Sequence, residues 1–134
     1  MKSEIRSYDT SSTDLLDLTR DAAGFAAQAG GDGLLHLFAP HATVGLALME
    51  TGSGSEEDLR AAIERLLPKD ASYRHSHGSP GHGRDHVLPA FISPSLTLPV
   101  VGGSIQLGTW QSIVLVDTNC DNPHRNVRFS FMPA

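Results

Sequence analysis

The chain has a single cysteine, Cys120, among its 134 residues. One thiol cannot form an internal disulfide, and it cannot supply the several thiolates of a structural zinc site. A bound metal would therefore have to use histidine and carboxylate ligands. A reducing compartment agrees with this cysteine content.

Long apolar runs and an excess of basic charge are also missing. No stretch approaches the roughly 20 apolar residues that a membrane-spanning helix needs, and residues 1–9 are too polar for the core of a signal peptide. The formal net charge is −5 and the isoelectric point is about 5.7, so no basic field draws the chain to nucleic acid or anionic lipid. We expect a cytoplasmic protein with neither nucleic acid nor membrane as partner.

The sequence motifs of the familiar cofactor enzymes are absent as well. We find no phosphate-binding loop, no dinucleotide-binding glycine fingerprint, no nucleophile elbow and no helix with the paired histidines of the zinc proteases. The length and the 40% apolar content suit one packed core, so residues 1–134 are expected to form a single domain.

Short apolar runs bounded by turn residues predict the strands. We expect strands over residues 4–9, 33–38, 43–49, 95–101, 111–117 and 126–131. One helix is predicted from an N-cap at Thr19 to about Ala29, and a second from a cap at Ser55 to Pro68. Because the strands cluster instead of alternating with helices, the order favours an α+β fold with a largely antiparallel sheet.

Residues 70–89 form a stretch rich in glycine, serine and histidine, with little periodicity. Four of the seven histidines, His75, His77, His82 and His86, fall within twelve residues of it. Neutral imidazole is a common ligand of zinc and related ions, so the cluster is a candidate metal site; a solvated polar loop is the alternative. The flanking Gly and Ser residues favour His77 and His82 as bystanders. The polar neighbours of Asp85 suggest that it is exposed, with a supporting role behind a ligand as the alternative.

Two further polar residues lie at the ends of one predicted strand. His41 follows Pro40 where the strand begins, so its ring would lie at the rim of the sheet, as a metal ligand or as an ordinary turn histidine. Glu50 ends the same strand. It could act as a general base or orient a ligand, with a solvated strand end as the alternative.

The segment Leu107-Gly108-Thr109-Trp110-Gln111 follows Gly102-Gly103, which marks a hairpin. Trp110 is the only tryptophan and stands beside the amide of Gln111. We consider Trp110 as a substrate contact, with a core anchor next to a structural turn as the alternative.

These pieces together resemble the YjbQ-like family, also labelled the secondary thiamine-phosphate synthase family, over nearly the whole length. The segment from Leu107 to Gln111 is the most specific of them. The matching features are Leu16-Asp17-Leu18-Thr19, His41-Ala42-Thr43, Glu50, Asp58-Leu59, His75, His86, Leu107-Gly108-Thr109-Trp110-Gln111 and Arg125-Asn126-Val127.

The resemblance implies a sheet folded into a sandwich with two helices, a homotrimer, and a pocket near the subunit boundary where His41, His75 and His86 hold a divalent metal, expected to be Zn²⁺. Glu50 and Gln111 match family positions near that pocket and are carried as catalytic candidates. Arg125 is carried as an anion contact. The family label implies a small phosphorylated substrate, with an aminopyrimidine diphosphate and a thiazole phosphate joined to give thiamine phosphate.

The chain departs from the family pattern at several positions around the expected site. Met49 stands where the family usually has Asn, and Arg84-Asp85 stands where it has Asn-Ala. Ala42 replaces a hydroxyl residue, and Val87 is not followed by a basic residue. These departures keep the three expected ligands and leave the substrate open. A metal-dependent enzyme is the leading hypothesis; a binding module without turnover and an accessory trimer that recruits other proteins are the rivals.

Overall fold

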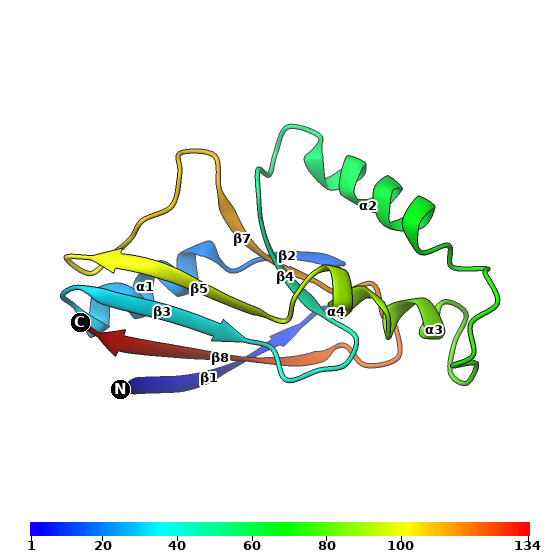
Figure 1. Cartoon of the computed structure of the whole chain (residues 1–134), viewed down its shortest axis with the longest axis horizontal. Helices are drawn as coiled ribbons and strands as arrows, with labels where there is room; N and C mark the ends of the chain where they lie inside the picture. Colours follow the sequence, from blue (N-terminus) through cyan, green and yellow to red (C-terminus); the bar gives the residue numbers. More distant parts are fainter.

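The computed structural model describes all of residues 1–134 (Figure 1). Its strands are β1 (Lys2–Asp9), β2 (Leu15–Asp17), β3 (Gly33–Phe38), β4 (Gly45–Met49), β5 (Ser95–Val101), β6 (Ser104–Ile105), β7 (Ser112–Val116) and β8 (His124–Pro133). Its helices are α1 (Thr19–Ala29), α2 (Ser55–Leu66), α3 (His82–Asp85) and α4 (Leu88–Phe91). The predicted α+β class with antiparallel sheets is confirmed.

The larger sheet has five strands in the order β1-β8-β3-β5-β6, all antiparallel. Strand β8 lies between β1 and β3, and its alternating residues Val127, Phe129 and Phe131 are buried against the core. Leu35 and Leu37 of β3 are buried in the same core. The period of two seen in the sequence therefore places one face of this sheet inside the protein.

The smaller sheet has three strands in the order β2-β7-β4 and forms a middle layer. Ile113 and Leu115 of β7 join the main core with α1 and the larger sheet. Val114 and Val116 point to the opposite face, where they pack in a second cluster with residues of α2 and α4. Strand β7 is thus buried on both faces.

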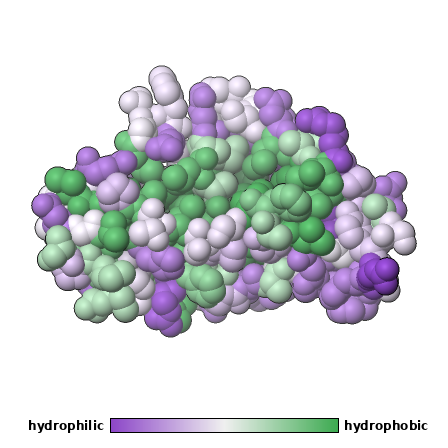
Figure 2. Space-filling view, viewed as in Figure 1, coloured by the Kyte–Doolittle hydropathy of each residue, from purple (hydrophilic) through white to green (hydrophobic).

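Helix α2 covers the outer face of the smaller sheet through Ile63, and α4 joins the same cluster through Leu88. Phe91 and Leu66 stay exposed beside this cluster, and Figure 2 shows apolar surface in the region between α4 and α2. No helix is both long and apolar enough to reach across a bilayer.

The shortest elements of the structure are the ones that the sequence did not predict. Strand β2 has three residues, and α3 and α4 have four each, so none carries enough periodicity to be seen in the sequence. Thr19 is the first residue of α1 and not its N-cap; the Oγ1 of Thr19 accepts a hydrogen bond from the backbone N–H of Ile113 at 2.8 Å. Gly54, in the left-handed conformation, occupies the N-cap position expected for Ser55.

Candidate metal centre

Three histidines of the segment 70–89 converge in the structure. His82 begins α3 and His86 follows its last residue, with the backbone N–H of His86 bonded to the carbonyl of His82 at 3.3 Å. One helical turn therefore puts both rings on the same face. His75 comes from the preceding loop, and one ring nitrogen from each of the three lies within 4.8 Å of the others. We call His75, His82 and His86 the histidine centre.

The rings of the histidine centre are in direct contact. His75 stacks on His86 with the ring centroids 4.1 Å apart and the planes at 28°. The Nε2 atoms of His82 and His86 lie 3.0 Å apart. His77 packs beside them, with its centroid 4.1 Å from that of His75. All four histidines of the loop therefore meet at one place.

The orientation of His82 is set by Asp121. The Nδ1 of His82 lies 2.8 Å from Oδ2 of Asp121, so the tautomer with the proton on Nδ1 donates to this carboxylate. In that tautomer the Nε2 lone pair faces His86. Hydrogen bonds from Ser79, together with His82, hold the pKa of Asp121 below its usual range, so the carboxylate stays charged. A carboxylate behind an imidazole is the arrangement that orients metal-ligating histidines.

His75 carries the one polar side-chain atom in the protein that is shielded from solvent and has no hydrogen-bond partner, its Nδ1. Loss of hydration lowers the pKa of His75 and of His86, and the neighbouring imidazoles lower both pKa values further. Both shifts favour the neutral rings, and the neutral imidazole is the form that binds a metal. The donor set therefore fits a metal ion.

Gly78 permits the close approach of the loop to the histidine centre. A Cβ on Gly78 would lie 2.6 Å from Cγ of the His82 ring, and the φ of Gly78 is +87°. Only glycine meets both conditions without displacing the ring. Gly83 is required for a similar reason, since a Cβ there would overlap the carbonyl oxygen of His75.

Comparison with known proteins decides the family. The family model described as "UPF0047 protein YjbQ-like" matches residues 3–134. The chain belongs to the YjbQ-like family. A UPF0047 protein of Mycobacterium tuberculosis is 56% identical over 132 residues, with 98% of each chain covered. The family expected from the sequence motifs is therefore confirmed.

Solved structures agree with the YjbQ-like fold. A hypothetical protein of Aeropyrum pernix matches with a TM-score of 0.87 and 29% identity, with 100% of each chain covered. A protein of Sulfolobus solfataricus, described as YbjQ-like and of unknown function, matches with a TM-score of 0.88 at 21% identity and 99% coverage of each chain. The second similarity concerns the fold alone.

The structure brings together two of the three ligands expected from the YjbQ-like resemblance. His75 and His86 meet, while His82, interpreted from its neighbours as a bystander, completes the centre. His41 lies outside it. The Nε2 of His41 accepts a hydrogen bond from the backbone N–H of Asn126 at 2.9 Å, and burial together with the charge of Arg125 lowers the pKa of His41.

Arg125 is placed differently from the expected anion contact. Its side chain is 2% exposed and forms a bidentate pair with Asp117, with Nε to Oδ2 at 2.7 Å and Nη2 to Oδ1 at 3.0 Å. Nη2 also donates to Thr43, and Thr10 donates to Asp117. The guanidinium is thus committed inside the fold. Asp117 is eight residues from Arg125 in the sequence and Thr43 is 82 residues away, and no sequence motif indicated either contact.

Asp85 is also buried, which corrects the expectation that it is exposed. Oδ1 of Asp85 accepts hydrogen bonds from Thr118 at 2.6 Å and from Nε of Arg84 at 2.9 Å. Arg84 in turn donates to Glu64 and to the carbonyl of Leu67 at the end of α2. The departure from the family pattern at Arg84-Asp85 therefore anchors α3, and with it His82 and His86.

The remaining predicted site residues lie away from the histidine centre in this chain. Glu50 is exposed after β4. Trp110 is 72% exposed, so the core-anchor alternative is wrong. The Oε1 of Gln111 accepts a hydrogen bond from the N–H of Gly108 at 2.8 Å and closes the turn. None of the three lines the cavity next to the histidines.

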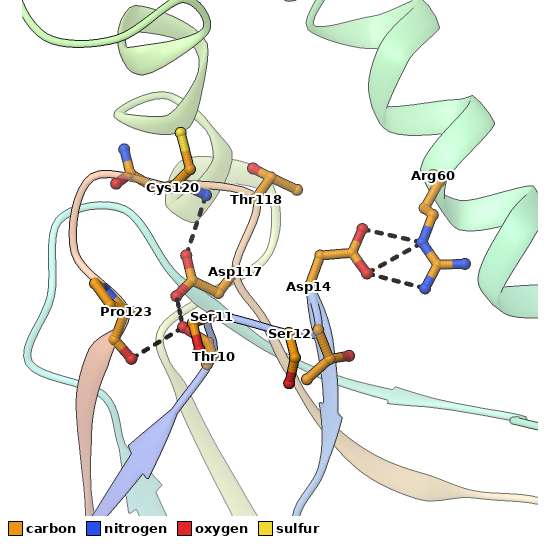
Figure 3. A pocket seen from close by; sticks show the side chains of 11 residues that line it. Thr10, Ser11, Ser12, Asp14, Arg60, Asp117, Thr118, Cys120 and Pro123 are labelled. Carbon is orange, nitrogen blue, oxygen red and sulfur yellow. Dashed lines mark hydrogen bonds and ion pairs between the residues drawn. The ribbon is translucent and has the colours of Figure 1, made fainter.

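A second cavity, of about 480 Å³, is lined in part by residues 117–120 (Figure 3). Hydroxyl groups of residues 10–13 line it. Its charged groups are already paired: Arg60 donates three hydrogen bonds to Asp14, and Asp117 is paired with Arg125. This cavity offers neutral hydrogen-bonding groups and no free cation.

Proposed function

We propose that this YjbQ-like protein binds one divalent metal ion, Zn²⁺ in the first place, through His75, His82 and His86. The observation that supports the proposal is the unpartnered Nδ1 of His75, shielded from solvent, in a group whose ring nitrogens lie within 4.8 Å of one another. A buried polar atom without a partner is costly, and a metal ion would satisfy it.

The donor set favours zinc or a related late transition metal. Three imidazoles and no thiolate match the usual catalytic zinc site, in which the fourth position is left for water or substrate. Asp121 would act behind His82, and the anchor at Arg84-Asp85 would hold the turn that carries two of the ligands.

We propose further that the metal serves a transferase reaction on a small phosphorylated substrate, of the kind that joins an aminopyrimidine diphosphate to a thiazole phosphate. Such an ion polarises a phosphate oxygen or lowers the pKa of a bound water. The cavity next to the histidines has no carboxylate in its lining, which supports an anionic substrate. His77, whose ring packs against that of His75, would take or give a proton in this reaction.

The catalytic roles expected for Glu50 and Gln111, and the substrate contact expected for Trp110, would require several chains to assemble. Within one chain these residues do not line the cavity. A homotrimer would bring surfaces of neighbouring chains to the site. The exposed apolar side chains Leu66 and Phe91 support an interface of this kind (Figure 2).

A metal-binding protein without turnover is the second candidate, and His77 favours it. The centroid of the His77 ring lies 4.1 Å from that of His75 and 4.9 Å from that of His82. A small movement of His77 would therefore supply a fourth imidazole. Four protein ligands close a zinc site against substrate. His77→Ala would then open the site, whereas in the enzyme it would leave the ligands intact and remove a proton carrier.

The experiment has two readouts on the same preparation. Metal analysis after dialysis against Zn²⁺ should give one ion per chain, and incubation with both thiamine precursors should give thiamine phosphate and pyrophosphate. His86→Ala is the control for both. One bound ion per chain without product would support the non-catalytic candidate. A product yield equal to that of His86→Ala would contradict the transferase function. Absence of bound metal would overturn the metal site.

A further inference from the structure

The cavity next to the histidine centre has a volume of about 380 Å³ and a one-sided charge. It is formed by the loop and short helix that carry the histidines, and His75, His77 and His82 line it. None of its thirteen lining residues is Asp or Glu. Its one permanent charge is the ammonium group of Lys69.

Lys69 is a free cation. The chain has two lysines, Lys2 and Lys69, and the ammonium of Lys69 takes part in no ion pair and no hydrogen bond. Glu64 lies close to its backbone, where Oε1 accepts from the Lys69 N–H, but Oε2 of Glu64 is paired with Arg84. The positive charge of Lys69 is therefore available to a ligand.

The stem of Lys69 is held in place by packing. A Cβ on Gly81 would lie 2.7 Å from Cγ and 3.0 Å from Cε of Lys69, so the lysine chain rests on the glycine backbone next to α3. A long side chain that packs along its stem keeps its charged end at the edge of the contact. Lys69 borders this cavity and also a neighbouring one, which Asp14, Glu64 and Arg84 line as well.

Hydroxyl groups in the same cavity remain free to donate. Ser72 and Ser76 line it, and neither hydroxyl has a hydrogen-bond partner within the chain. The hydroxyl of Tyr73 is already used by the carbonyl of Pro68. One free cation, two free hydroxyls and no carboxylate form a set that prefers an anion with several acceptor oxygens.

We propose that Lys69 is the residue that makes this cavity selective for a phosphate monoester group, which it binds next to the histidine centre. The inference rests on the proposed function for the neighbouring metal, but the contact with Lys69 does not require the metal. It assigns to Lys69 the role of anion contact that the family resemblance implied for Arg125. The cavity of Figure 3 serves as the contrast, since its carboxylates and its one arginine, Arg60, are already paired.

The test measures the affinity of the protein for methyl phosphate at pH 8, above the ordinary range of histidine. Methyl phosphate is a monoester without a second recognition group. Four proteins are compared without metal: wild type, Lys69→Gln, Lys69→Arg and Lys2→Gln. Lys2 lies at the start of β1, distant from α3, and its substitution makes the same change of net charge (Figure 1). Methylammonium is the probe of opposite charge.

We expect Lys69→Gln to weaken methyl phosphate binding by about tenfold, the effect of losing one charge-assisted hydrogen bond. Lys69→Arg should retain most of the affinity, Lys2→Gln should equal wild type, and methylammonium should not bind. Equal affinity in wild type and Lys69→Gln would overturn the proposal, as would a wild-type protein that does not bind the monoester.

Zinc stoichiometry, measured separately on the same proteins, keeps the two proposals apart. Bound zinc with no effect of Lys69→Gln would contradict the role of Lys69 and leave the metal site standing. If the protein takes up no zinc but binds the monoester through Lys69, the metal site would be contradicted and the role of Lys69 would stand.

Discussion

Two polar clusters include residues of the segment 117–123, and they differ in how completely their hydrogen-bonding groups are satisfied. In the first cluster Asp117 forms a bidentate pair with Arg125 and accepts a further hydrogen bond from Thr10. In the second cluster Asp121 orients His82, while a shielded nitrogen of His75 has no partner. The satisfied cluster links strands of the fold, and the unsatisfied cluster is the one for which we propose a ligand.

The difference has a physical cause in the charges that each cluster holds. A buried ion pair is tolerated only when its hydrogen bonds are nearly complete, because both ions lose their hydration. Imidazoles can instead be packed together as neutral rings, since their pKa lies close to neutrality and falls further on burial. A histidine cluster can therefore wait for a ligand in a way that a buried arginine cannot.

The largest expected effect is on the satisfied cluster. Arg125→Ala should lower the free energy of unfolding by about 3–5 kcal/mol, because Asp117 is left charged and buried without its partner. Denaturation by urea measures this change. Arg128→Ala, on the exposed face of the same strand, is the control and should cost much less. If both substitutions lower the free energy of unfolding by the same amount, the contrast between the clusters is contradicted.

The second prediction is the response to metal, which only the unsatisfied cluster should show. Zn²⁺ at about 100 times its dissociation constant should raise the free energy of unfolding by about 2.7 kcal/mol, because the ion binds the folded state. A chelator should reverse the effect. A variant without His75 should show no such gain, and a full gain in that variant would place the ion elsewhere.

The third prediction concerns the support behind His82. Asp121→Asn should lower the zinc affinity by about 10–100-fold while the fold stays intact, because the amide no longer fixes the tautomer of His82 with a negative charge. Isothermal titration gives the affinity. Asp70→Asn, an exposed change with the same loss of charge, should have little effect. A similar loss in both variants would mean that net charge, and not orientation, controls binding.

The smallest predicted effect is a pH dependence at His41. The pKa of His41 is lowered by burial, so below pH 6.5 the unfolded chain binds a proton that the folded chain resists. The contribution of His41 to stability is therefore complete above pH 6.5 and is lost as the pH falls through the folded pKa. In the presence of a chelator, the free energy of unfolding of the wild-type protein should fall between pH 6.5 and pH 5. In His41→Gln this fall should be smaller. An unchanged slope would contradict the lowered pKa.

Much of the fold follows from the sequence, because its signals are local. The apolar runs bounded by turns give β3 and β5 with their observed ends, and the paired glycines after Ala29 give the end of α1. The family motif at residues 107–111 gives the architecture, which is now confirmed. The strand β2 is too short for such a signal.

The site was harder to predict, because it depends on a one-turn helix and on contacts between distant residues. The spacing of His82 and His86 by four residues was the available signal for one helical face, but the glycines around them argue against a helix. The pairing of Arg125 with Asp117 has no local signature, since it requires the ends of two strands to meet. The sequence alone could therefore not separate ligands from structural residues.

The most direct measurement compares zinc affinity in His82→Ala and His41→Ala, each against wild type. His82 and not His41 belongs to the histidine centre, so we predict a loss of more than about 100-fold in His82→Ala and near wild-type affinity in His41→Ala. Loss of zinc binding in His41→Ala, with full binding in His82→Ala, would contradict the account.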